Sequence, residues 1–152
     1  MLRSDLVVDL EPHLMVDYDD DDGIDCDQTA ADVARFLIKQ KCEVVRSCAI
    51  VTEVCAGTIT PIVDFDLRPT VGSDTDRGVA DIGHLILSTT AAGKVMFDEV
   101  GQGTVLEPGE EVVVQLITAA SGVGPTGHFI PYLQVKIIPE TQANLDDTTE
   151  TA

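Results

Sequence analysis

The chain has 152 residues, enough for one domain with an ordinary core. Apolar residues make up 44% of the chain, but aromatic residues only 4%, with no Trp, so aliphatic side chains must build the core, which suits a β-sheet. The net charge of −18 belongs mainly to the ends, with −9 in residues 1–27, −5 in residues 28–139 and −4 in residues 140–152. Because nucleic acids and anionic membranes attract Lys and Arg, we expect neither as a partner.

No apolar run approaches the ~20 residues of a membrane span, and no secretory signal opens the sequence. We therefore expect a protein made in the cytoplasm. Its four cysteines form no Cys-x-x-Cys pair and are expected to stay reduced; they are Cys26, Cys42, Cys48 and Cys55.

Residues 1–27 are predicted to form an acidic, extended, solvated N-terminal arm, because like charges this dense repel one another. We take its acidic run as a candidate partner-binding site, formed by Asp17, Tyr18, Asp19, Asp20, Asp21 and Asp22. Calcium binding stays open. If Gly23 takes the sixth position of a calcium loop, Tyr18 and Thr29 take the first and last positions. These two positions require carboxylates, so the match fails at both ends.

Residues 28–139 are predicted to form a mainly-β domain, an antiparallel, jelly-roll-like β-sandwich with at most one short helix. Asp27 or Thr29 could cap that helix over 30–37. Strands are expected in the apolar or alternating segments 6–10, 38–54, 59–67, 82–87, 95–97, 112–117 and 129–138. Pro131 suggests that the last strand has a free edge or a bulge. Residues 140–152 are expected to form an acidic C-terminal tail.

Motifs that could carry catalysis are weak. Residues 121–129 have the glycine spacing of a phosphate-binding loop, but His128 stands where the loop needs Lys, and a strand is expected to follow. The histidines are isolated in sequence, and no Gly-x-Ser-x-Gly elbow is present. Asp64 and Asp66 project from one face of a strand, which could hold a catalytic pair, although alternating polar residues often produce this pattern.

The cysteines also lack the short spacing of a structural zinc site, so we expect them to pack as small apolar side chains in the core. The sequence therefore predicts no enzyme, no cofactor and no metal site.

Strand and turn features stand out in segments 64–69, 72–74, 91–95, 106–112 and 127–133. In these segments, residues 57–139 resemble the decoration (cement) proteins that stud the capsids of tailed bacteriophages. The resemblance implies a non-enzymatic virion protein on the outside of the capsid, stabilising contacts between subunits of the major capsid protein as a homo-oligomer, a dimer or trimer. Its extended arm would serve as a clamp.

Two alternatives remain open. A tail-fibre or carbohydrate-binding module would use exposed aromatic residues, for which the chain offers Tyr18, Tyr132 and four Phe. An enzyme on a cupin-like fold would need a metal-binding His-x-His pair, which the sequence lacks.

Overall fold

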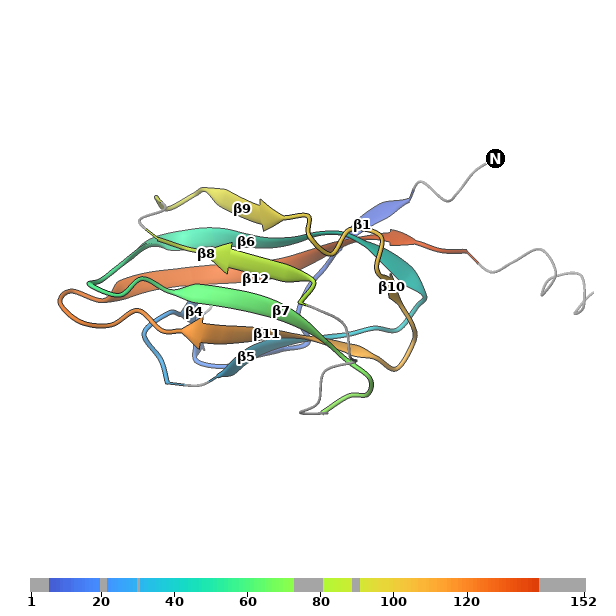
Figure 1. The fold of residues 1–152 in the computed structure, drawn as a ribbon, viewed down its shortest axis with the longest axis horizontal. Helices are drawn as coiled ribbons and strands as arrows, with labels where there is room; N and C mark the ends of the chain where they lie inside the picture. The colour runs from blue at the N-terminus through green and yellow to red at the C-terminus, as the bar shows by residue number, and fades with distance from the viewer. Residues whose placement is uncertain (1–5, 20–21, 30, 73–80, 89–90, 140–152) are drawn as a thin grey trace, which may run out of the picture.

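The computed structural model describes residues 6–19, 22–29, 31–72, 81–88 and 91–139. Twelve strands are found there: β1 Val7–Leu10, β2 Leu14–Met15, β3 Tyr18–Asp19, β4 Gly23–Asp25, β5 Asp32–Leu37, β6 Cys42–Ala56, β7 Ile62–Arg68, β8 Gly83–Ile86, β9 Val95–Asp98, β10 Val105–Leu106, β11 Glu111–Thr118 and β12 Thr126–Ile137. They form two antiparallel sheets (Figure 1). The first has the order β10-β6-β12-β4-β3, with β1 added to β12 and β9 to β6; the second has the order β2-β5-β11-β7-β8.

The prediction of a mainly-β, antiparallel sandwich is confirmed. Each segment expected to be a strand contains one, and the turn at 107–110 joins β10 to β11, with Gly109 at a φ of 92°. The described residues contain no helix, and so none that could cross a membrane. The predicted acidic tail lies outside the described residues.

The prediction of a short helix over 30–37 is wrong, because β5 occupies this segment between β2 and β11. The apolar pattern fits both structures: Val33, Ala34 and Phe36 are all buried, at spacings that a helix would also place on one face. Pairing with distant residues decides between them, since Val112 lies opposite Phe36 in the register of the sheet.

The prediction of a solvated arm is also wrong for the described part of residues 1–27, which is extended but bound to the sandwich. β1 pairs with β12 in the first sheet, the chain crosses to the second sheet as β2, and β3 and β4 return to the first as a hairpin. Beyond the acidic run, Ile24 and Cys26 alternate with Asp25 and Asp27, and both apolar side chains are fully buried. Burial of these side chains and pairing of the backbone outweigh the repulsion between the carboxylates.

The core lies between the two sheets and is mostly aliphatic, as the composition predicts. Phe36 and Phe65 stack at its centre, with ring centroids 6.1 Å apart. All four cysteines are free and buried, which confirms the expectation of packed thiols. Burial raises the pKa of Cys42 to about 11, so this thiol stays protonated near neutral pH.

Pro131 lies in β12, which is not an edge strand. However, no strand of the described residues pairs with β12 at Pro131 on the flank opposite β6. On the flank of β12 opposite β6, β4 pairs with residues 128–129 and β1 pairs with residues 133–136. On this flank, the carbonyl of Gly127 accepts a hydrogen bond from the N–H of Cys26, and the N–H of Ile137 donates one to the carbonyl of Leu6. Because every second residue of a strand directs its backbone groups to the same flank, the backbone of Pro131 also faces this flank. The missing N–H of Pro131 therefore faces the interruption between β4 and β1, where no ladder bond is lost.

We predict that Gly23→Ala destabilises the protein by about 2–4 kcal/mol. Gly23 has a φ of 94°, and an added Cβ would lie 2.6 Å from the carbonyl oxygen of Phe129. Gly103 is a matched control, because its φ of 91° is similar while nothing lies within 4 Å of its Cβ position. Gly103→Ala should cost only about 1 kcal/mol in urea unfolding, and equal losses would contradict the proposed packing of the hairpin on β12.

Candidate functional site

The described part of the predicted partner-binding run lies at the β3–β4 hairpin, which forms one edge of the first sheet. Tyr18 is 39% exposed and pairs with Ile24. Asp17, which precedes it, is exposed and has a φ of 53°, while Asp22 is exposed at the start of β4. Asp19 belongs to β3, and Asp20 and Asp21 lie outside the described residues. Tyr18 and Asp19 thus pair with Ile24 and Gly23, and this ladder differs from the long open loop that a calcium site of this kind requires.

Tyr18 lines a shallow groove of about 440 Å³ at the interruption between β1 and β4. Two tyrosines, two prolines, two isoleucines and two carboxylates line it: Tyr18, Tyr132, Pro12, Pro131, Ile50, Ile130, Asp9 and Glu11. The lining contains no basic side chain. The groove is therefore apolar and aromatic, with carboxylates as its only charged groups.

Two rows of apolar side chains cross the outer face of the first sheet and reach this groove. In the first row, Val95 of β9 lies opposite Ile50 of β6, which lies opposite Ile130 of β12. In the second, Phe97, Cys48 and Tyr132 are aligned in the same way.

Val95 and Phe97 are 50% and 52% exposed. The next row is polar, with Gln134 donating to Asp9 at 3.1 Å. An apolar centre with a polar border is typical of a surface that binds another protein.

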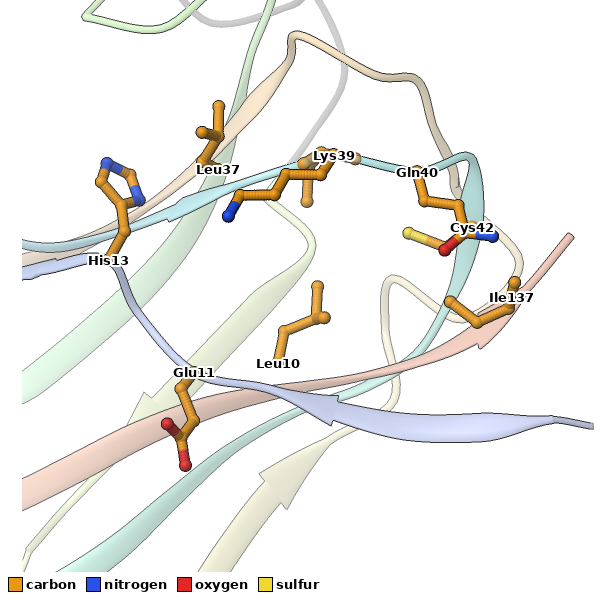
Figure 2. Close-up of a pocket in the computed structure, with 9 residues that line it drawn as sticks. Leu10, Glu11, His13, Leu37, Lys39, Gln40, Cys42 and Ile137 are labelled. Carbon is orange, nitrogen blue, oxygen red and sulfur yellow. The ribbon is translucent and has the colours of Figure 1, made fainter.

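A second, smaller hollow of about 240 Å³ lies at one end of the sandwich (Figure 2). Figure 2 labels apolar side chains of its lining, including Leu10, Cys42 and Ile137, and the charged side chains of Glu11 and Lys39. Since the Cys42 thiol stays protonated, it is not an activated nucleophile.

The outer face of the second sheet carries a network of buried charges. Glu111 is fully buried, and its Oε1 accepts hydrogen bonds from Arg35 at 2.7 Å and from the backbone N–H of Gly72 at 3.0 Å. Arg35 also bonds Asp32 at 2.9 Å, and the buried Arg68 lies 3.6 Å from Asp66. Charges this deeply buried are tolerated because each lies beside an opposite charge.

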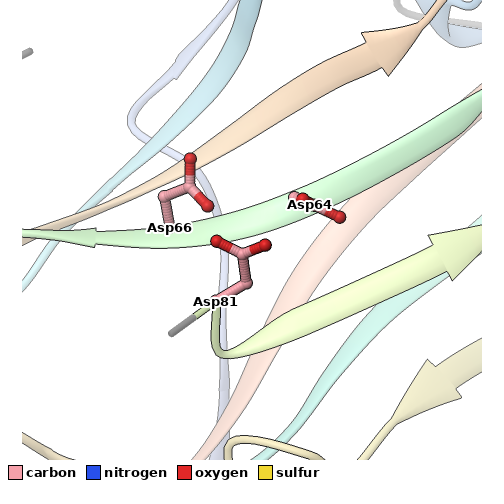
Figure 3. A group of neighbouring side chains, drawn as sticks. All are labelled: Asp64, Asp66 and Asp81. Atoms are coloured by element: carbon pink, nitrogen blue, oxygen red, sulfur yellow. The ribbon is translucent and has the colours of Figure 1, made fainter. Parts of the chain in front are cut away.

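Three carboxylates meet in this network, with ligand oxygens within 4.8 Å of one another: Asp64 and Asp66 from β7, and Asp81 just before β8 (Figure 3). Burial raises the pKa of Asp64 to about 6, with a hydrogen bond to Asp81 adding to the rise and His84 opposing it. A hydrogen bond from Asp66 lowers the pKa of Asp81. A shared proton can thus relieve the repulsion, and these are the described residues that could hold a divalent cation instead.

The histidines do not gather in one place. His84 Nδ1 lies 2.5 Å from Asp64, His128 Nδ1 lies 2.8 Å from Glu53, and His13 Nε2 lies 3.4 Å from Glu111. The glycine-rich residues 121–127 connect β11 to β12, so a strand follows them, as the sequence analysis expected.

The sequence pointed to Tyr18 in the groove and to Asp64 and Asp66 in the carboxylate cluster, but it did not show which residues join them. It placed Asp64 and Asp66 correctly on one face of a strand, yet gave no reason to add Asp81, which the fold brings back from 15 residues further along the chain. Asp9, Glu11 and Tyr132 join Tyr18 only because β1 and β4 pair with the same strand, β12, and β4 holds β3 beside it. The one local signal was Pro131, which marks the interrupted flank.

Comparison with protein-family models, with curated proteins and with solved structures finds no match for this chain.

We predict that Asp64→Asn stabilises the protein at pH 7.5 by about 1–2 kcal/mol. The folded-state pKa of Asp64 lies above its unfolded value, so the folded protein binds the extra proton and loses stability as the pH rises from about 4 to about 6. Asn imitates the protonated carboxyl, so the gain in the free energy of unfolding should vanish at pH 4, where Asp64 itself is protonated.

Urea unfolding at both pH values measures the effect, with Glu107→Gln as a control at an exposed acid. An advantage of Asp64→Asn that is equal at pH 4 and pH 7.5 would show that the ionised carboxylate is not disfavoured in the fold.

Proposed function

We propose that the chain is a non-enzymatic structural virion protein that binds the outside of a phage capsid and stabilises contacts between major capsid subunits. It docks through the outer face of the first sheet and works as a homo-oligomer. The resemblance of residues 57–139 to decoration proteins motivates the choice of partner.

One observation supports a protein-binding role above all: the apolar rows on the outer face of the first sheet. The face of an antiparallel sheet that is exposed only to water carries mostly polar side chains. Here, two rows of apolar side chains cross that face instead. The rows are Val95, Ile50 and Ile130, and Phe97, Cys48 and Tyr132. Burying exposed aliphatic and aromatic side chains under a partner supplies the free energy of docking.

The N-terminal segment changes how a clamp would work. Because β1 to β4 are already paired within the protomer, the segment contributes a preformed surface beside the apolar rows. A preformed surface loses less conformational entropy on binding than a free arm that must order.

A carbohydrate-binding module, as found in tail fibres, is the second candidate. The observation that favours it is the meeting of Tyr18 and Tyr132 in one groove, since sugars stack on exposed aromatic rings. A saturable response to oligosaccharides, without binding to capsid shells, would support this candidate over the first.

The test is solution mass and amide hydrogen exchange of the purified chain, alone and with expanded, DNA-free capsid shells of tailed phages. We expect a dimer or trimer whose strands β6, β9 and β12 gain protection on the shells. Strands β1 and β4 should be protected already in the free protein, because they pair with β12.

Two variants make the test specific to the docking face. Val95 and Ile117 are 50% and 51% exposed, on the outer faces of the first and second sheets respectively. Val95→Asp should weaken shell binding at least about tenfold, while Ile117→Asp should leave it nearly unchanged. Equal effects of the two variants, or a monomer that ignores the shells, would refute the proposal.

A further inference from the structure

We propose that the groove between β1 and the β3–β4 hairpin receives an arginine or lysine side chain from an extended basic segment of the docking partner. This inference rests on the proposed function and specifies the chemistry of the partner. It assigns the carboxylates at the groove to recognition of charge, and the two tyrosines to contact with the aliphatic stem and the cationic head of the side chain.

Charge complementarity is the first argument. Asp9 and Glu11 are exposed, and they supply the only charges in the lining. Asp17 and Asp22 are exposed on the adjoining hairpin. A carboxylate or phosphate ligand would be repelled here, whereas a cation is attracted and steered by the strongly negative chain.

The shape and the aromatic content of the groove are the second argument. Tyr18 and Tyr132 line the same space as Ile50 and Ile130, so a long side chain can bury its methylene groups while its charged end reaches the carboxylates. The faces of aromatic rings also attract cations. Burial, together with a hydrogen bond to Cys48, raises the pKa of Tyr132 to about 12, so its phenol stays neutral.

The backbone argues against added β-structure as the mode of binding. An incoming strand would pair with the free flank of β12, but Pro131 offers no N–H there. Recognition must therefore come from side chains, which suits a segment presented in an extended conformation.

Intrinsic tyrosine fluorescence tests the inference directly, because the chain has no Trp and its only two tyrosines both line the groove. The probes are a short Gly/Ser peptide with two arginines and the same peptide with citrulline, the neutral isostere, in place of arginine. We expect a saturable change in emission with the arginine peptide that weakens as salt is added, and none with the citrulline peptide. Equal responses to both peptides, or none to either, would overturn the inference.

Charge reversal localises the effect. Glu11→Lys should weaken binding of the arginine peptide about tenfold. Glu107→Lys should change it less than about twofold, because Glu107 is equally an exposed acid but does not line the groove. Equal losses would mean that net charge, not the groove, attracts the peptide, and saturation by neutral oligosaccharides alone would assign the groove to sugars.

The same variants separate this inference from the proposed function. If the shells bind the wild-type and Glu11→Lys proteins equally and the arginine peptide has no effect, the groove assignment fails while the docking proposal stands. If the arginine peptide binds at the groove but shells are ignored, the docking proposal fails and the groove remains a site for basic segments.

Discussion

The pairing of β6 with β12 is the contact on which the rest of the structure depends. These are the two longest strands, and they lie side by side from the pair Thr126 and Ala56 to the pair Ile137 and Cys42. The remaining strands of the first sheet add to their free flanks: β9 and β10 pair with β6, β1 and β4 pair with β12, and β3 pairs with β4. Because the register fixes which residues face outward, it also aligns the apolar rows on the outer face of the first sheet.

The N-terminal segment shows how a strongly acidic sequence can still fold. Its like charges repel, but extended backbone holds successive side chains on opposite sides, so acids point to water while Leu10, Met15 and Ile24 turn inward. The crossing from one sheet to the other also creates the interruption opposite Pro131, which becomes the groove. The charge that makes the segment look disordered in sequence thus becomes the charged border of the groove.

The second sheet treats charge differently. Its outer face buries Asp66, Arg68 and Glu111 in one network, at a desolvation cost that only opposite charges and hydrogen bonds can offset. Carboxylates outnumber guanidinium groups there, and burial raises the pKa of Asp64 to about 6, so a proton on Asp64 relieves the excess negative charge only at mildly acidic pH. The two outer faces therefore differ: aligned apolar rows cross the first, whereas the second carries a network of paired charges beside the exposed Ile86 and Ile117.

The sequence by itself determined the β class, the positions of most strands, the aliphatic core and the burial of the cysteines, because strand periodicity and turn residues act over a few neighbouring positions. Only the tertiary structure decided that 32–37 is a strand, that the N-terminal segment is bound, and that Asp81 joins Asp64. Each of these depends on pairing between residues far apart in the chain: Phe36 needs Val112, and Leu10 needs Leu133. Local pattern cannot choose such partners, because the energy that selects them comes from contacts that exist only once both sheets have formed.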